Sequence, residues 1–270
     1  MAKERPTIAV QMYSVDEHLQ TVPDFENTLR RRREVGYEAV QYANRGVLGG
    51  DEPEIDVGTA RRMLDDNGLA CLSERRPWSA LRGRTQSEIK RAQTPGCEVL
   101  YVNFLEPPYD RFDPASYRAF ARDSLPVVEA MESAGLSLGY HNHAHELFHP
   151  KTGGESIYDL LLREFDPRIA IEPDVYWIAY AGANPATWLR NLSGRVKEAH
   201  VKGAEVVPDD RYEMVKLFFA PVGEGNLDWD TIIPAGREAG VQTWIVEQDI
   251  CQRDAFDCMR SSYEFLAARA

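Results

Sequence analysis

Four short stretches of this sequence each carry a side chain that could bind a metal ion. Three of these side chains are carboxylates and one is an imidazole, and each lies at or just beyond the end of a predicted strand. The candidates are Glu146 in YHNHAHE (140–146), Asp174 in IEPDVYW (171–177), His200 in EAHVK (198–202) and Glu247 in WIVEQD (244–249). Mixed carboxylate and imidazole ligands suit Mn²⁺, Mg²⁺ or Co²⁺ better than a structural zinc, which prefers thiolates. If the fold brings these side chains together, they form a divalent-cation site.

Each candidate also has an ordinary structural interpretation. Glu146 could be a surface-loop carboxylate, Asp174 a turn residue after a proline, and His200 a buried histidine with satisfied hydrogen bonds. Glu247 is the strongest single case, because it follows Trp-Ile-Val on a strand where an unpaired buried carboxylate would be costly. The metal interpretation is favoured because four such residues end consecutive predicted strands.

The histidines within residues 141–145 are further candidates. Alternation along a strand sends His141 and His143 to the same face. We expect His143 and His145 to support the metal ligands, contact substrate or transfer a proton, and His141 to contact substrate. The alternative is that these imidazoles only hydrogen-bond the loop backbone.

The elements that must position these residues form a regular alternation. The predicted strands are Thr7–Val15, Tyr37–Ala43, Leu69–Glu74, Glu98–Phe104, Ser137–His143, Arg168–Asp174, Val196–Lys202 and Thr243–Gln248. The predicted helices are Pro23–Val35, Val57–Asn67, Ser87–Thr94, Ser116–Ala134, Ser156–Phe165, Pro185–Leu192, Trp229–Ala239 and Ala255–Ala267. Eight strands alternating with eight helices predict an α/β fold, a single (β/α)8 TIM-barrel domain over residues 1–270.

The barrel prediction explains how distant residues could share one site. No glycine-rich dinucleotide fingerprint follows the first predicted strand, which disfavours a Rossmann fold. Catalytic groups of such barrels lie at the carboxyl ends of the strands, and neighbouring strands are roughly 5 Å apart. Four candidates on neighbouring strand ends can therefore converge on one cation.

Composition excludes several classes of partner. The chain has 270 residues and a formal net charge of −12, which argues against binding nucleic acid or an anionic membrane surface. The four cysteines form no CxxC pair, and no apolar stretch has the character of a signal peptide or a membrane span. We therefore expect a cytoplasmic protein that acts on a small molecule.

The motifs resemble those of the sugar phosphate isomerase/epimerase family. This family belongs to the xylose isomerase-like TIM-barrel superfamily, which also contains inosose dehydratases, ketose 3-epimerases and endonuclease IV. The resemblance spans residues 7–266, and YHNHxxE, DxYW, HxK and EQD occur in the family's order, with QMYSV (11–15) and VGEG (222–225) beside them. It implies that Glu146, Asp174, His200 and Glu247 bind Mn²⁺ or a similar ion. It also implies that Tyr13, Trp177 and Lys202 line the substrate pocket.

Two positions depart from the family pattern. Glu74, followed by two arginines, stands where the family often has a histidine, and Gly203 replaces the aspartate of His-x-Lys-Asp. Both change the rim of the pocket, so relatives' substrates do not transfer. We expect the run RRPW (75–78) to be a solvated loop anchored by Trp78, with binding of an anionic or aromatic substrate portion as the alternative.

The resemblance and the ligand types imply proton abstraction next to a carbonyl, through an enediolate stabilised by the metal. The candidate bases are Glu146, Glu247, His143 and His145. We expect isomerisation or epimerisation of a ketose or keto-sugar derivative, and we lean towards a substrate without phosphate. The alternative is a lyase that performs β-elimination, either dehydrating an inosose or cleaving a 3-keto-glycoside, including a C-glycoside.

Two other functions fit less well. A nuclease of the endonuclease IV type would need a three-zinc cluster, more histidines and a basic face, whereas this chain has six histidines and is acidic. A non-catalytic binding subunit would be indicated by a missing ligand, and all four positions are filled. A homo-oligomer or a small partner subunit remains compatible with the sequence.

Overall fold

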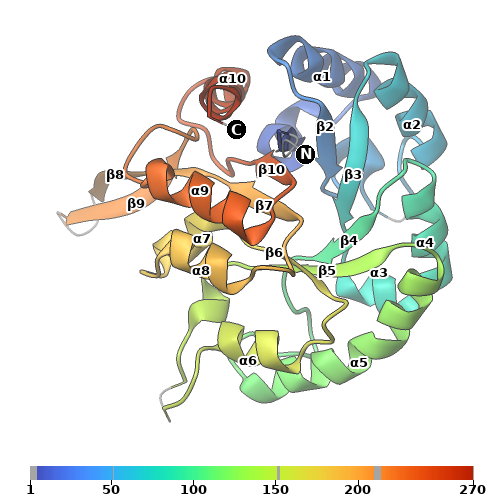
Figure 1. Ribbon diagram of the computed structural model, residues 1–270. Helices are drawn as coiled ribbons and strands as arrows, with labels where there is room; N and C mark the ends of the chain where they lie inside the picture. The colour runs from blue at the N-terminus through green and yellow to red at the C-terminus, as the bar shows by residue number, and fades with distance from the viewer. Residues whose placement is uncertain (1–4, 51, 151–152, 210–213, 270) are drawn as a thin grey trace.

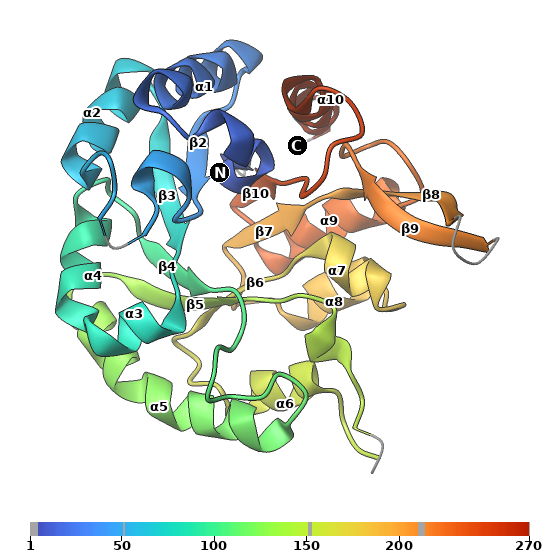
Figure 2. The same ribbon diagram turned by 180° about the vertical axis from the view of Figure 1, so that it is seen from behind.

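Eight parallel strands form a nearly closed barrel, with helices packed around it, in agreement with the sequence prediction (Figures 1 and 2). The computed structural model describes residues 5–50, 52–150, 153–209 and 214–269. The strands are hydrogen-bonded in the order β6-β5-β4-β3-β2-β1-β10-β7. They are β1 (Thr7–Gln11), β2 (Ala39–Tyr42), β3 (Ala70–Arg75), β4 (Val99–Val102), β5 (Ser137–His141), β6 (Ala170–Glu172), β7 (Glu198–Val201) and β10 (Thr243–Val246).

The barrel closes between β6 and β7 through few backbone contacts. Asp174, two residues beyond β6, forms an isolated parallel bridge with His200 on β7. The backbone N–H of His200 donates to the carbonyl oxygen of Pro173 at 2.9 Å. Two of the four predicted metal ligands therefore lie at the seam that completes the barrel.

The helices follow the predicted alternation closely, and Ala255–Ala267 has the predicted bounds. They are α1 (Val22–Val35), α2 (Val57–Asp66), α3 (Trp78–Gly83), α4 (Thr85–Gln93), α5 (Pro114–Ser133), α6 (Ile157–Glu164), α7 (Val175–Tyr180), α8 (Pro185–Asn191), α9 (Trp229–Ala239) and α10 (Ala255–Ala267). Asp113 and Asn184 cap α5 and α8 with their side chains, and a proline follows each cap. Within the part of the chain that the structure describes, no helix combines the length and the apolar character needed to cross a membrane.

The structure differs from the predicted elements at several points. The first predicted strand ends at Gln11, because the Gln11 side chain accepts a hydrogen bond from the N–H of Tyr13 and starts the 3-10 helix η1 (Met12–His18). Two further 3-10 turns are η2 (Gly46–Leu48) and η3 (His145–Leu147). The short helices α3 and α7 were not predicted, because each is a six-residue turn inside a connection.

An antiparallel hairpin also lies outside the predicted pattern. It consists of β8 (Gly203–Asp209) and β9 (Met214–Ala220), and both views show it projecting from the barrel (Figures 1 and 2). The hairpin starts directly after Lys202, at Gly203. A Cβ atom there would lie 2.1 Å from the carbonyl oxygen of Pro221, so the close approach of the two chain segments requires glycine.

The inside of the barrel is polar beneath the carboxyl ends of the strands. Alternate residues of the strands point inward, and many of them carry hydrogen-bonding groups. The amide nitrogen of Gln41 donates to Ser73 Oγ at 2.8 Å and to Glu172 Oε1 at 2.6 Å, and Gln11 donates to the amide oxygen of Gln41. Because these groups are fully buried and hydrogen-bonded to one another, they hold a rigid polar floor under the strand ends.

Gly236 on α9 allows this helix to pack directly on β10. A Cβ atom at this position would lie 2.1 Å from Cη2 of Trp244, which is fully buried. The indole ring therefore occupies the space that a side chain would need.

We predict that Gly236→Ala lowers the free energy of unfolding by about 1–3 kcal/mol, because overpacking of a dense core outweighs the gain in helix propensity. Urea denaturation measures this change. Gly83→Ala in α3 is the matched control, because a Cβ atom added there would meet no other atom within 4 Å. The control should be neutral or slightly stabilised, and equal effects of the two changes would contradict the packing argument.

Candidate metal and substrate site

Asp174 is held by its role as the N-cap of α7. Its Oδ1 atom accepts hydrogen bonds from the backbone N–H groups of Tyr176 at 2.9 Å and Trp177 at 3.2 Å. Its own N–H donates to Oδ1 of the buried Asn142 at 3.0 Å. The second carboxylate oxygen, Oδ2, faces the site and lies 3.2 Å from Lys202 Nζ. Burial raises the pKa of Asp174, although Lys202 and His200 oppose this shift.

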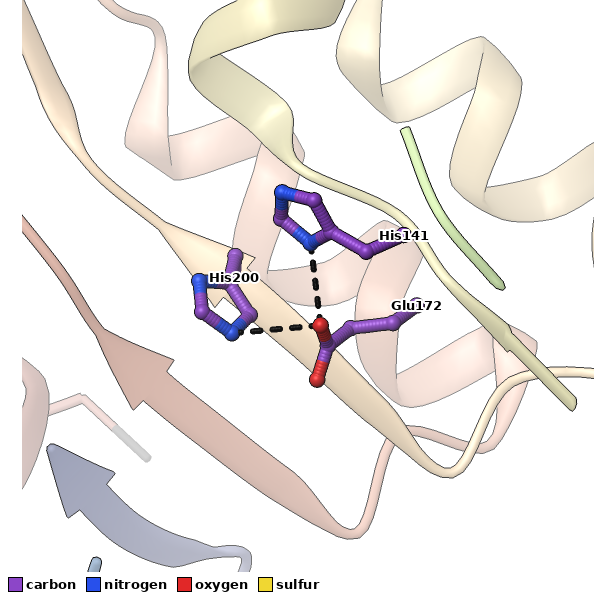
Figure 3. Close-up of side chains that lie close together, drawn as sticks. All are labelled: His141, Glu172 and His200. Carbon is purple, nitrogen blue, oxygen red and sulfur yellow. Dashed lines mark hydrogen bonds and ion pairs between the residues drawn. The ribbon is translucent and has the colours of Figure 1, made fainter. Parts of the chain in front are cut away.

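His200 and His141 meet at one buried carboxylate, Glu172 (Figure 3). His141 Nδ1 lies 2.9 Å and His200 Nε2 lies 3.3 Å from the same oxygen, Glu172 Oε2. Burial lowers the pKa of His141 well below its usual value, with Arg75 adding to the effect. For His200 burial acts in the same direction, but Glu172 and Glu247 outweigh it and raise the pKa. The two imidazoles therefore differ in charge preference although they share a carboxylate.

Glu247 lies at the end of β10 and is surrounded by cationic groups. Arg75 donates to both of its carboxylate oxygens, at 2.9 Å to Oε1 and 3.0 Å to Oε2. Oε2 also lies 2.7 Å from Lys202 Nζ and 3.0 Å from His200 Nδ1. Burial alone would raise the pKa of Glu247, but Arg75, Lys202 and His200 lower it well below its ordinary value. Glu247 is therefore an ionised carboxylate at the centre of the site.

Lys202 joins three carboxylates. Besides its contacts with Asp174 and Glu247, its Nζ atom lies 3.0 Å from Asp249 Oδ1. The residue is only 2% exposed. Burial would lower the pKa of Lys202, but these carboxylates raise it above its usual value, so the ammonium stays charged.

The chemistry of this cluster fits a divalent cation. Ligand atoms of His141, Asp174 and Glu247 all lie within 4.8 Å of one another, and the same holds for His141, Glu172 and His200. Carboxylate oxygens suit Mg²⁺ and Mn²⁺, and imidazole nitrogens suit transition metals, so this mixed set fits a divalent cation. Asp174 and Glu247 thus share one group with His141, and His200 lies 3.0 Å from Glu247. The metal role of these residues stays a prediction.

Glu146 lies in a different environment from the other three predicted ligands. Its Oε1 atom accepts a hydrogen bond from the hydroxyl of Tyr140 at 2.7 Å, and its Oε2 atom accepts one from the N–H of His143 at 2.7 Å. His145 Nε2 lies 3.0 Å from Oε1. The metal-binding group that contains Glu146 consists of His143, His145 and Glu146. The metal role of Glu146 stays a prediction.

A cavity of about 480 Å³ opens above the cluster. Four of the predicted residues line it, namely Tyr13, His143, Trp177 and Lys202. The remaining lining residues are Ala43, Asn44, Arg45, Arg75, Arg76, Pro77, Asn103, Phe104, Glu106, Phe219 and Asp249. Aromatic rings and cationic groups thus form the walls, and the buried carboxylates lie at the base.

His143 is the imidazole that faces this cavity. Its ring lies 6.2 Å from the ring centroid of Phe104 and 5.5 Å from that of Trp177. Its buried Nδ1 atom has no hydrogen-bond partner among the described residues. Burial, with Lys202 and Arg75 nearby, lowers the pKa of His143 well below its usual value. Burial and the two neighbouring cations therefore favour the neutral form of this ring.

The run RRPW (75–78) is not the solvated loop that we expected. Arg75 is 9% and Arg76 4% exposed, because both guanidinium groups pair with buried carboxylates. Arg76 donates to both oxygens of Glu88, at 2.6 and 3.0 Å. Trp78 is the anchor that we predicted, since it is buried and packs edge-on against Phe120 at 4.8 Å.

Sequence analysis did not assign Glu172, Asp249 or Arg75 to the charged cluster. Alternation along β3 places Arg75 on the same face as Ser73, whereas Asp174 and Asp249 lie beyond the ends of β6 and β10. Glu172 precedes Asp174, Asp249 follows Glu247, and Arg75 follows Ser73.

Known proteins were compared with this chain and its structure. A family model described as the xylose isomerase-like TIM barrel matches residues 29–267. A sugar phosphate isomerase/epimerase from Parabacteroides distasonis superposes with a TM-score of 0.78 and 22% identity, covering 99% of this chain and 96% of that chain. A xylose isomerase-like TIM barrel protein from Mycobacterium smegmatis in complex with magnesium gives 0.72 and 14%, covering 98% and 96%.

An L-ribulose 3-epimerase gives a TM-score of 0.71 and 13% identity, covering 97% of this chain and 94% of that chain. Among curated proteins no sequence matches this chain. The structural similarities establish the barrel fold, and the family match extends over most of its strands and helices. The chain belongs to the xylose isomerase-like TIM barrel family.

Proposed function

We propose that this protein is a divalent-metal-dependent isomerase or epimerase that moves a proton next to the carbonyl of a ketose or keto-sugar derivative. The observation that carries the proposal is the close grouping of His141, Asp174 and Glu247, with His200 Nδ1 3.0 Å from Glu247. Arg75 and Lys202, which contact Glu247, line an aromatic-walled cavity. Isomerases and epimerases occur among the proteins that share this fold. A cavity of about 480 Å³ with aromatic and charged walls suits a sugar rather than a macromolecule.

Asp174, His200 and Glu247 would hold the cation, and His141, which shares a group with Asp174 and Glu247, would be a further ligand. We propose Mn²⁺ as the natural ion, with Mg²⁺ or Co²⁺ as substitutes. Bound there, the cation would stabilise negative charge on the substrate oxygens as a Lewis acid. Glu146 would act on the same site only if its carboxylate turned away from the Tyr140 hydroxyl.

The protein's own groups would bind the sugar and move its proton. The ring of Trp177 and the ammonium of Lys202 lie on one wall of the cavity, with Nζ 5.4 Å from the ring centroid. They would orient the apolar face and an oxygen of the sugar. His143 is the base that we favour over Glu146, Glu247 and His145, because it lines the cavity with an unpartnered nitrogen.

A lyase that performs β-elimination is the second candidate. Such a reaction needs a proton donor for the departing oxygen, and two donors lie on the cavity wall. Lys202 Nζ and Asp249 Oδ1 lie 3.0 Å apart, and burial raises the pKa of Asp249 to about 6. A dehydration or glycoside cleavage would begin with the same proton abstraction and would differ in the product.

We predict that the protein with Mn²⁺ exchanges deuterium from D₂O into the position next to the carbonyl of at least one ketose, inosose or 3-keto-glycoside. Glu247→Gln should abolish both Mn²⁺ binding and exchange, because it removes the central anionic ligand. NMR of the reaction mixture measures exchange and also identifies an epimer, an isomer or an eliminated product. Glu224→Gln is the control, because Glu224 pairs with Arg253 outside the cavity.

The absence of exchange on every substrate, in protein that binds Mn²⁺ tightly, would argue against enolisation and for a binding role. Exchange that persists in Glu247→Gln would remove this residue from the proposed site.

We predict that His143→Gln slows deuterium exchange by about 10²-fold or more, because a general base contributes on the order of 10²–10⁴ in rate. Mn²⁺ affinity should stay within threefold, since His143 is not one of the three converging ligands. The exposed His149 provides the matched control, and His149→Gln should exchange at the wild-type rate. Normal deuterium exchange in His143→Gln would show that His143 is not the base and would point to Glu146, Glu247 or His145.

A further inference from the structure

Arg75 contacts two of the three converging metal ligands. Its Nη1 and Nη2 atoms donate to Oε1 and Oε2 of Glu247 at 2.9 and 3.0 Å. The same Nη2 atom lies 3.0 Å from Nδ1 of His200. The side chains of Arg75 and Glu247 are 10% and 0% exposed, so this ion pair is shielded from water.

This contact links three strands across the barrel. Arg75 ends β3, while His200 and Glu247 belong to the ends of β7 and β10. A guanidinium that bridges opposite sides of a barrel must cross the space in which the carboxyl-end ligands converge. Arg75 therefore lies inside the ligand cluster, in contrast to Arg76, which turns away from it to pair with Glu88.

A divalent cation and Arg75 would compete for the same atoms. Cations of this class bind carboxylate oxygen and imidazole nitrogen at roughly 2.0–2.2 Å. The atoms Glu247 Oε2 and His200 Nδ1 lie 3.0 Å apart, and Nη2 lies 3.0 Å from each of them. A cation bound between these two atoms would lie close to the guanidinium in a buried environment, where like charges repel strongly.

We propose that Arg75 is a built-in competitor of the metal, so that its guanidinium must leave Glu247 before a divalent cation can bind Glu247 and His200. The inference rests on the proposed function only in placing the metal at Asp174, His200 and Glu247. Lys202 also contacts Glu247 and Asp174, but it would keep a carboxylate partner in Asp249, which is not one of the proposed ligands. Arg75 thereby lowers the metal affinity of this chain below the affinity that its ligands would otherwise give.

The charges of the cluster support this exchange. Glu172, Asp174 and Glu247 are three fully buried carboxylates, and the buried cations beside them are Arg75 and Lys202. Without the guanidinium, the three carboxylates would face only the ammonium of Lys202 and the imidazole of His200. A divalent cation would then restore the balance, which is why a neutral side chain at position 75 should favour metal binding.

The test is a calorimetric titration of the chelator-treated, full-length protein with Mn²⁺ in the absence of substrate. Arg75→Gln should bind Mn²⁺ at least tenfold more tightly than wild type, a difference of about 1.4 kcal/mol. The Mn²⁺ affinity of Arg75→Lys should lie between those of wild type and Arg75→Gln. Lysine keeps the positive charge but loses the bidentate contact with Glu247. Combining Arg75→Gln with Glu247→Gln should remove the gain.

The matched control is Arg45→Gln. Arg45 lines the same cavity, but its guanidinium lies 5.3 Å from the ring centroid of Tyr13 rather than on Glu247. Its Mn²⁺ affinity should stay within twofold of wild type. Circular dichroism of each variant checks that the fold is retained.

Equal or weaker Mn²⁺ binding by folded Arg75→Gln would overturn the inference. If Arg75→Gln does not fold, a crystal of the wild-type protein soaked in Mn²⁺ decides. Metal on Glu247 with Arg75 displaced supports the competition, and metal there with Arg75 still paired overturns it. Competition without deuterium exchange on any substrate would contradict the proposed reaction and leave this inference standing.

Discussion

Burial of negative charge at the carboxyl end of the barrel is the constraint on which this structure depends. Glu172, Asp174 and Glu247 are all fully buried, and a buried carboxylate is tolerated only with a cation or with several hydrogen-bond donors. The chain meets this requirement with Arg75, Lys202 and two histidines drawn from separate strands. These ion pairs and hydrogen bonds therefore also hold β3, β5, β6, β7 and β10 in place relative to one another.

The polar floor of the barrel continues this network with buried hydrogen bonds beneath the charged cluster. Gln41 links Ser73, Glu172 and His200 within one set of buried hydrogen bonds. Each of these side chains is a hydrogen-bond partner of another. Removing one would leave its partners with unsatisfied buried polar atoms, at a cost of about 1–3 kcal/mol of stability each. The orientation of His200 thus depends on residues of β2 and β3 that never reach the cavity.

The fold was largely predictable from the sequence, because the alternation of short β-branched runs with capped helices is a local signal. Asp113 and Asn184 marked helix starts, and the run 255–267 was predicted with its observed bounds. The hairpin after Gly203 and the short α7 escaped prediction, since their stability comes from contacts with distant segments. Tyr176 of α7, for example, stacks on Phe219 of β9 with centroids 4.4 Å apart.

The closeness of Asp174, His200 and Glu247 was predictable from the sequence, whereas the side chains that they contact were less so. Asp174, His200 and Glu247 lie together because strand ends of a barrel share one rim. The hydrogen bonds of Glu146 with nearby residues, and the contact of Arg75 with the distant Glu247, could not be predicted from the sequence. Both depend on side-chain direction in three dimensions. Alternation gives the face on which a side chain lies, but not the partner that it contacts.

Asp174 performs two tasks with its two oxygens, and this has a consequence for how the pocket can change. One oxygen caps α7, which carries Trp177 in its first turn, and the other faces the cluster beneath the cavity. The position of Trp177 in the cavity wall is therefore coupled to the position of the charged groups beneath the cavity. Substitutions that reshape this wall for a new sugar must preserve the first turn of α7, whereas Asn44, which also lines the cavity, is held by Arg76 instead of Asp174. Divergence in substrate preference among chains built on this plan should accordingly accumulate on the Asn44 side of the opening.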